Sequence, residues 1–272
     1  MNFTVQPKSL TLGVIIPVFN SGRDAIHGIR SVVAQTYGPV QEIIVVDDGS
    51  YDDSVRFLFE ACEGLSIRVS ILSIPNGGAA NARNHGMKNC SCDLYAFLDS
   101  DDTWTSNKLE LQLPAFIDPG VGLVGCLTTM GRGKALRSGV GGFCQVIGIR
   151  QQLFKNYFQT SSVIVRRNVV ESVGSFPNNQ RHAEEGDFFN RIAARYKCVL
   201  LPEVLVNYSS GKLGFGERGL SANLVAMEKG ELHNILRAYL RRDCGFGLFV
   251  AAVAYSLIKF ARRLIVTYIK RI

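Results

Sequence analysis

The sequence lacks the features of repeat, fibrous and secreted proteins. Its 272 residues contain no low-complexity segment and no internal repeat with a period of about twenty to fifty residues. Residues 1–10 hold no apolar run of the kind found in a signal peptide, so we expect a cytoplasmic protein. Because 47% of the residues are hydrophobic and 19% are charged, the chain can bury the core of one large domain, with or without an appendage.

The cysteines argue against a zinc finger. Seven cysteines are scattered without the paired spacings that hold a structural zinc ion. Cys90 and Cys92 are too close for a relaxed disulfide on one strand or helix. We therefore expect reduced thiols, the usual state of cysteines in the cytosol.

Positive charge is balanced everywhere except at the C-terminal end. The net charge is +7, and residues 237–272, with eight basic residues and one acid, carry all of it. The other 236 residues hold 22 basic and 22 acidic side chains. A neutral body disfavours nucleic-acid binding, whereas a basic, apolar tail favours contact with an anionic membrane surface.

Apolar runs alternate with helical patterns along the first part of the chain. Buried strands are expected at 12–19, 42–46, 67–74 and 94–98, and helices at 24–35, 54–62 and 79–88. This alternation predicts an α/β fold with a Rossmann-like, mostly parallel central sheet flanked by helices. Later elements are expected to be a helix at 107–113 ended by Pro114, a strand at 120–128, a helix at 184–196, a strand at 198–208 and a helix at 221–240.

Polar residues stand at the ends of three expected strands, at 19–20, 47–48 and 99–102. Ligands bind beyond the carboxyl ends of parallel strands, so these clusters should converge on one crevice. The sequence DSDD at 99–102 crowds three acids, whose repulsion a divalent cation that prefers oxygen ligands would relieve. A solvated acidic turn, with Asp102 capping the next helix, is the alternative.

Three further motifs each allow a structural and a functional interpretation. Residues 47–50 form either a turn or a contact to a nucleobase or ribose. Residues 76–84 open a helix whose N–H groups and Arg83 attract phosphate, or are a simple helix start with a surface arginine. The acids at 184–187 are either favoured by the dipole at a helix N-terminus or include a general base.

Taken together, five segments resemble the family 2 glycosyltransferases, which have the GT-A fold. They are VIIPVFN at 14–20, VVDDGS at 45–50, GGAANARNHG at 77–86, AFLDSDDTW at 96–104 and EEGDFFNRIA at 184–193. Their order and spacing match as well, over about residues 11–210. The resemblance implies a catalytic domain at 1–220, with a nucleotide-binding half at about 1–102 and an acceptor-binding half at about 103–220. A helical segment at 221–272 would follow.

The resemblance also implies roles for single residues. A divalent cation, Mn²⁺ or Mg²⁺, would be held by a DxD-type pair, Asp101 and Asp99. Asp102 would contact the donor sugar. The general base would be Glu185, where the family usually has Asp, with Glu184 and Asp187 as alternatives. The donor nucleotide would be bound by Pro17, Val18, Asn20, Asp47, Asp48, Arg83, Asp99 and Ser100.

The implied reaction is sugar transfer from a nucleotide-diphosphate sugar, with UDP as the likeliest nucleotide by family habit. Metal-assisted single displacement would invert the anomeric centre and glycosylate a hydroxyl of a glycan or lipid-linked acceptor in surface polysaccharide or glycan biosynthesis. Processive synthases of the family carry a Q-x-x-R-W motif, but the only tryptophan is Trp104, so a single addition is expected. The Gly-rich, basic loop at 131–142 is a candidate for choosing the acceptor.

The tail predicts peripheral membrane attachment on the cytoplasmic face. Residues 244–258 are uncharged, but as a helix they span only about 22 Å, short of the roughly 30 Å hydrocarbon core. Beyond them the helical pattern places basic residues on one face and apolar residues on the other. The basic residues are Lys259, Arg262, Arg263 and Lys270. A helix hairpin packed on the catalytic domain or on a second subunit is the alternative.

Three rival functions were weighed. A nicotinamide-dependent dehydrogenase would need G-x-G-x-x-G after the first strand, where the sequence is PVFNSG at 17–22. A sugar nucleotidyltransferase would carry a glycine-rich, arginine-containing loop there. A non-catalytic sugar-nucleotide-binding or scaffold protein of the same fold remains possible, because Glu185 stands where the family has Asp.

Overall fold

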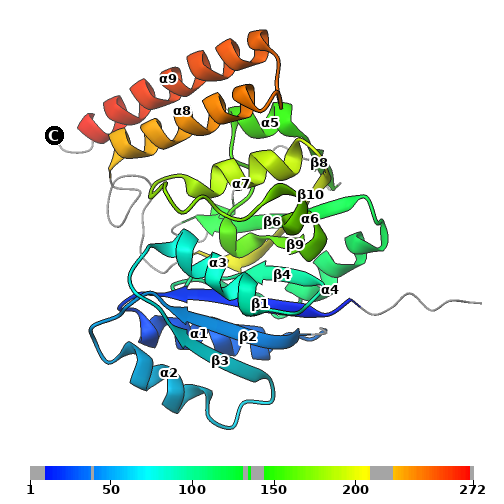
Figure 1. The fold of residues 1–272 in the computed structure, drawn as a ribbon, viewed down its shortest axis with the longest axis vertical. Coiled ribbons are helices and arrows are strands. Elements are labelled where there is room, and N and C mark those ends of the chain that lie inside the picture. Colours follow the sequence, from blue (N-terminus) through cyan, green and yellow to red (C-terminus); the bar gives the residue numbers. More distant parts are fainter. Residues whose placement is uncertain (1–9, 38–39, 131–133, 136–143, 209–222, 270–272) are drawn as a thin grey trace, which may run out of the picture.

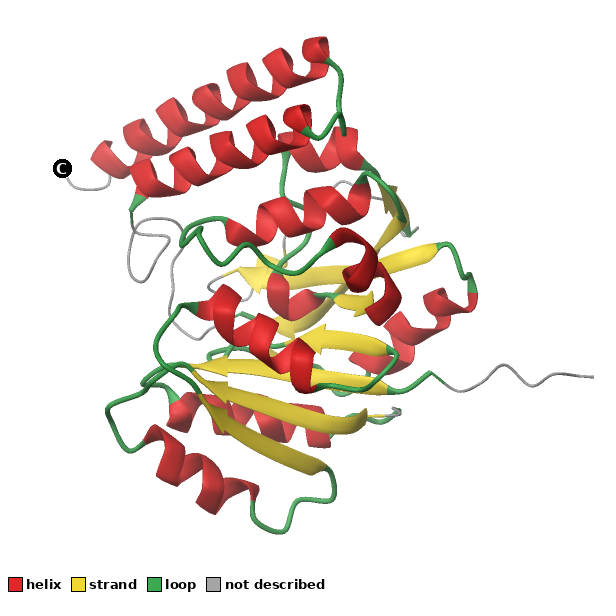
Figure 2. Cartoon of the chain, in the orientation of Figure 1, coloured by secondary structure: helices red, strands yellow, loops and turns green. Residues whose placement is uncertain are grey.

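The computed structural model describes residues 10–37, 40–130, 134–135, 144–208 and 223–269 (Figure 1). One mixed sheet of ten strands runs through them in the order β3-β2-β1-β4-β9-β6-β10-β5, with β7 beside β6 and β8 beside β10. Helices cover both faces of this sheet (Figure 2). The α/β class, with a central sheet flanked by helices, is confirmed.

The first four strands in sequence form the parallel half of the sheet. They are β1 (Leu12–Val18), β2 (Val40–Asp47), β3 (Arg68–Ser73) and β4 (Leu94–Phe97). The helices between them are α1 (Gly22–Val33), α2 (Ser54–Cys62) and α3 (Ala79–Asn89). All seven were expected from the sequence, with boundaries that differ by at most two residues.

The other half of the sheet is mixed. β9 (Ile164–Arg166) pairs antiparallel with both β4 and β6 (Val121–Met130), whereas β10 (Lys197–Asn207) pairs parallel with β6. The remaining strands are β5 (Thr103–Trp104), β7 (Lys134–Ala135) and β8 (Gln145–Ile147). The helices are α4 (Lys108–Gln112), η1 (Leu113–Ile117), α5 (Ile149–Phe154), η2 (Thr160–Ser162), α6 (Arg167–Val173) and α7 (Glu184–Ala193).

The helix expected at 107–113 is present as α4, which ends before Pro114. Pro114 itself lies in the first turn of the 3-10 helix η1, which follows α4 directly. A proline is tolerated there since the first amides of a helix have no intrahelical partner. The loop at 131–142 lies outside the described residues except for the two residues of β7.

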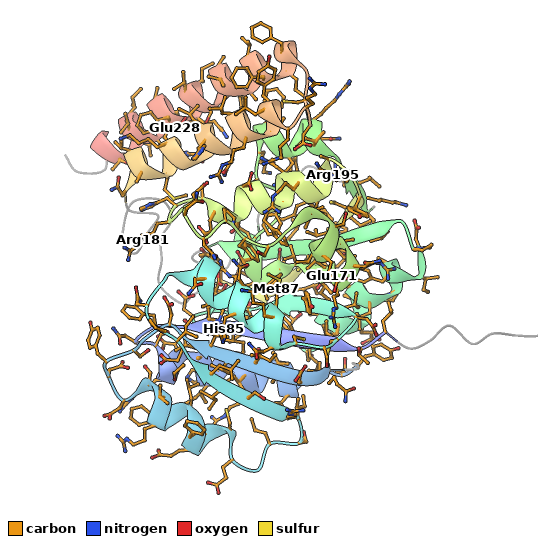
Figure 3. The ribbon with its side chains drawn as sticks, in the orientation of Figure 1. His85, Met87, Glu171, Arg181, Arg195 and Glu228 are labelled. Atoms are coloured by element: carbon orange, nitrogen blue, oxygen red, sulfur yellow. The ribbon has the colours of Figure 1, made fainter. Side chains whose placement is uncertain are left out.

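The core forms two layers, one on each face of the sheet. The period of two along β1 sends Leu12, Val14 and Ile16 into one layer and Ile15 into the other. The second layer holds Ala82 and Met87 of α3 (Figure 3). This two-sided burial explains why the strands of the parallel half are apolar without interruption.

The C-terminal helices α8 (Leu224–Leu240) and α9 (Phe246–Ile269) form a hairpin beside the sheet domain (Figure 1). α8 packs on α7, and α9 packs on α8 and α5. None of the helices in the described ranges is long and apolar enough to cross a membrane.

The expected basic face of the tail is not an open surface. The Lys259 ammonium lies 3.3 Å from a Glu231 carboxylate oxygen, and Arg263 lies 2.8 Å from the other. Arg263 also faces Glu228, which is buried between the two helices (Figure 3). These cations join α9 to α8 because α8 supplies buried acids, a partnership that the pattern of α9 alone does not reveal. Lys270 lies outside the described residues.

Two glycines test the packing of this fold. A Cβ on Gly86 would lie 2.4 Å from Cγ2 of the stiff Ile15 side chain, whereas a Cβ on Gly247 would meet no described atom within 4 Å. Overpacking costs about 1–3 kcal/mol, which exceeds the roughly 1 kcal/mol that alanine gains over glycine in a helix. We expect Gly86→Ala to lower the free energy of unfolding in urea and Gly247→Ala to leave it unchanged or raise it. Equal effects at both sites would contradict the packing described.

Candidate active site

The loops that follow β1, β2 and β4 meet at one edge of the sheet. Asn20, in a left-handed conformation with φ 48°, donates its N–H to Ser50 Oγ at 2.9 Å and accepts from the Tyr51 N–H at 3.1 Å. Ser21 Oγ lies 2.9 Å from Ser100 Oγ. The three polar clusters therefore converge, as the parallel topology predicts.

The two aspartates after β2 differ in their surroundings. Asp48 accepts the N–H groups of Gly77 and Gly78, both at 2.8 Å, and an amide hydrogen bond from Asn76. It thereby ties the β2 loop to the start of α3. Asp47 is also buried, and among the described residues its carboxylate accepts only the Ser50 N–H. Asp48 is thus a structural tie, and Asp47 keeps more capacity for a ligand.

Pro17 and Val18 lie inside β1 with buried side chains. Val18 contributes its carbonyl oxygen, which accepts the Asp48 N–H at 2.8 Å. Both residues contribute to this edge of the sheet through the backbone. Two exposed aromatic side chains of the same edge, Phe19 and Tyr51, form an edge-to-face pair with ring centroids 6.0 Å apart.

Arg83 of α3 is buried and bridges the two halves of the site. Its guanidinium donates to Asp99 Oδ1 at 2.7 Å and to Glu184 Oε1 at 3.0 Å. Its centre also lies 5.5 Å from the ring of Phe176. Arg83 is therefore not a surface arginine, since it joins the acidic loop after β4 to the first turn of α7.

The acids after β4 have distinct environments. Asp99 is held by Arg83, and its N–H donates to Ser161 Oγ at 3.0 Å. Asp102 is 1% exposed and accepts the Ser161 hydroxyl at 2.5 Å. Asp102 thus holds the loop from its buried side. This burial favours a role in supporting the loop over direct contact with a sugar. Asp101 is partly exposed.

Tyr208, which follows β10, interacts electrostatically with this acidic cluster. Burial raises the pKa of its phenol, and neighbouring carboxylates raise it further. Those carboxylates are Asp102, Asp99, Asp101 and Glu185. The carboxylates of Asp99 and Asp101 are hard oxygen donors, which is the ligand type that Mg²⁺ and Mn²⁺ prefer.

The structure separates the three acids at the start of α7. Glu184 is paired with Arg83, and Asp187 is paired with Arg191 at 3.0 Å and with Arg241 at 2.7 Å. The Glu185 side chain is partly exposed, and no described side chain forms a hydrogen bond or ion pair with its carboxylate. Glu185 is thus the acid of the three that is not committed to an ion pair.

The protonation of Glu185 follows from the same geometry. Desolvation by the surrounding protein raises the pKa of its carboxyl most, the charge of Glu184 adds to this rise and Arg83 opposes it, which together place the pKa at about 8. A carboxyl that titrates near neutral pH is suited to accept a proton during a reaction.

Comparison with known proteins places this arrangement in a family. A model of "Glycosyl transferase family 2" matches residues 13–173. This chain belongs to glycosyltransferase family 2. The matched residues contain β1 to β4, the loop with Asp99 and Asp101, and Arg83.

Single family 2 relatives resemble parts of the chain. An uncharacterized glycosyltransferase of Rickettsia conorii is 43% identical over 102 residues, which make up 38% of this chain and 16% of that protein. The Escherichia coli UDP-Glc:alpha-D-GlcNAc-diphosphoundecaprenol beta-1,3-glucosyltransferase WfgD is 39% identical over 103 residues, 38% of this chain and 39% of that enzyme. The chain therefore spans less than half the length of both curated relatives.

A solved structure confirms the GT-A fold expected for family 2. The mannosyltransferase PcManGT from Pyrobaculum calidifontis, in complex with GDP-Man and Mn²⁺, matches with a TM-score of 0.69 and 17% identity. The match covers 95% of this chain and 75% of that one.

Several residues of this family 2 site were missed by sequence reasoning. Ser161 and Tyr208 come from segments with no motif, and Arg241 approaches Asp187 from a helix 54 residues away. No local pattern signals such contacts. The exposed pair was signalled by the motifs, because Phe19 lies inside the segment 14–20 and Tyr51 directly follows the segment 45–50.

The raised pKa of Glu185 predicts how stability depends on pH. A carboxyl whose pKa is about 8 in the folded state and 4.5 as a model value stabilises the fold at low pH, and this contribution is lost as the pH rises through 8. Glu185→Gln should therefore gain melting temperature relative to wild type between pH 5 and pH 8.5. Glu184→Gln, which removes the partner of Arg83, should lower it at both values. A difference for Glu185→Gln that does not grow with pH would contradict the assignment.

Proposed function

We propose that this chain transfers a sugar from a nucleotide-diphosphate sugar, with a UDP sugar as donor, to a hydroxyl of a glycan or lipid-linked acceptor. The observation that carries the proposal is the separation of the acids on α7. Glu184 and Asp187 are bound in ion pairs, whereas Glu185 is left with a raised pKa beside the acidic loop. A free carboxyl next to a diphosphate site is what sugar transfer to a hydroxyl requires.

In this proposal, Glu185 accepts the acceptor proton. A sugar hydroxyl is a weak nucleophile until its proton leaves during attack, and a base that titrates near the working pH is efficient. Glu185 is one methylene longer than the Asp usual in the family, and Glu184 beside it is fixed by Arg83. Attack from the side of Glu185, opposite the leaving diphosphate, inverts the anomeric centre by single displacement.

Asp101 and Asp99 are proposed to hold the divalent cation, Mn²⁺ or Mg²⁺. When bound, the ion supplies positive charge to the leaving diphosphate. The protein's own contribution is to fix the loop, because Ser161 binds both Asp99 and Asp102. Mn²⁺ in the complex of PcManGT supports a cation at such a site.

The donor nucleotide is proposed to lie along the ends of β1 and β2. Asp47 would accept hydrogen bonds from the base, with Asn20 shaping the ribose pocket. Phe19 and Tyr51 offer exposed aromatic faces at the same edge, where a base can stack. The catalytic domain is assigned to residues 1–220, with the acceptor-binding half at about 103–220.

A lipid-linked acceptor is supported by WfgD, whose name gives an undecaprenol-linked substrate. The C-terminal hairpin supports it independently through an exposed apolar stripe on α9, opposite the face that packs on α8. At helical spacing, the stripe holds Val250, Leu257, Ile258, Leu264 and Ile265. We propose that this stripe lies on the cytoplasmic membrane surface, where it would bring the site to the acceptor.

A thermal-shift panel of nucleotide diphosphates and their sugars, with and without Mn²⁺, tests the donor site. A ligand at a hundredfold excess over its Kd stabilises the folded state by ~2.7 kcal/mol. We expect a UDP ligand with metal to raise the melting temperature of wild type by several degrees and Asp101→Ala to lose this rise. Asp118→Ala, at the opposite edge of the sheet, is the control and should keep it.

Two results of this panel would change the conclusion. A metal-dependent shift without transfer to any acceptor would favour the non-catalytic sugar-nucleotide-binding protein. No shift with any nucleotide would remove the central support for a transferase.

Vesicle flotation tests the apolar stripe. Wild type should float with phosphatidylglycerol vesicles, and the double variant Ile258→Ser, Ile265→Ser should bind about tenfold more weakly, because it removes two large apolar side chains from the contact. Ile117→Ser changes an even more exposed isoleucine, in η1 rather than α9, and should bind like wild type. Unchanged flotation of the double variant, or a dimer that this variant dissociates, would reject the membrane contact.

A further inference from the structure

The first turn of α7 begins from an unusual backbone conformation. Ala183, directly before Glu184, has φ 55° and ψ 30°, the left-handed region that residues with a Cβ rarely adopt. Such a conformation is strained and persists only where the surroundings enforce it. Ala183 is buried, so the enforcing contacts come from the protein itself.

The C-terminal helix α8 supplies those contacts. Asn234, a buried residue of α8, donates from Nδ2 to the Ala183 carbonyl oxygen at 2.7 Å. Its Oδ1 accepts from Gln180 Nε2 at 2.9 Å, and Gln180 also donates to the carbonyls of His182 and Ala183. The nitrogen and the oxygen of the Asn234 amide thus both hold residues that lead into α7.

Packing restricts the same turn sterically. A Cβ on Gly230 of α8 would lie 2.4 Å from the His182 carbonyl oxygen. A Cβ on Gly186 of α7 would lie 2.7 Å from Asn234 Nδ2. The two helices meet through glycines at this point, so little space is left for the turn to move. Further along, Arg241 at the end of α8 donates to Asp187 at 2.7 Å.

We propose that Asn234 is a positioning residue for catalysis: it fixes the left-handed Ala183 turn and thereby the direction in which Glu185 enters the site. This inference rests on the proposed role of Glu185 as base. It makes α8 part of the catalytic unit, although the helix lies outside the segment at 1–220 that the motifs mark.

Three variants of α8 distinguish this positioning role from a general effect on stability. Asn234→Asp keeps the size and the acceptor for Gln180 but removes the donor to Ala183. Gly230→Ala leaves Asn234 in place and instead forces the His182 carbonyl to move. His233→Ala, at an exposed neighbouring position of α8, is the matched control.

Two measurements on the full chain test the proposal. In steady-state kinetics, normalised to the fraction of chains that bind the donor nucleotide, we expect kcat to fall about ten- to a hundredfold in Asn234→Asp and Gly230→Ala, with donor KM within about twofold of wild type. In amide hydrogen exchange, the segment 184–187 should exchange faster in both variants. His233→Ala should match wild type in both measurements.

Each result decides something. Faster exchange with unchanged kcat would show that the contact holds the turn but does not position the base, and would overturn the proposal. Unchanged exchange in both variants would overturn it as well. If Glu185→Gln turns over like wild type, the role of Glu185 fails, and hydrogen exchange still reports whether Asn234 holds the turn.

Discussion

The buried guanidinium of Arg83 is the interaction on which the site depends. It donates to Asp99 on the β4 loop and to Glu184 on α7, so one cation joins the nucleotide end of the sheet to the helix with the proposed base. Removing one partner of a buried ion pair is costly because a charge is left without compensation. This bridge commits Glu184 and leaves Glu185 as the acid with a raised pKa. A single arginine on α3 thus accounts for the different environments of two adjacent glutamates.

The C-terminal hairpin connects two roles that are separate in the sequence. On one side, α8 holds the start of α7 through Asn234 and Arg241. On the other side, α9 exposes an apolar stripe. Because α9 is tied to α8 by ion pairs from Lys259 and Arg263, contact of the stripe with a surface would bear on the helix that holds the Ala183 turn.

The parallel half of the fold and the convergence of its loops could be predicted from the sequence, because uninterrupted apolar strands alternate with helices there. The short β9 could not, since three residues carry no periodic signal. The pairing of Lys259 could not be predicted from the pattern of α9, because its partner Glu231 lies on another helix. Family motifs marked the acids of α7, but only the distant partners Arg83 and Arg241 distinguish Glu184 and Asp187 from Glu185.

The most direct test of this account is turnover in the three amide variants Glu184→Gln, Glu185→Gln and Asp187→Asn, with donor binding measured on the same samples by calorimetry. General-base catalysis contributes about 10²–10⁴-fold. The account predicts a loss of that size in Glu185→Gln with unchanged donor affinity, and smaller losses in the other two that follow their stability. Turnover that survives in Glu185→Gln but disappears in Glu184→Gln or Asp187→Asn, in folded protein that still binds donor, would contradict it.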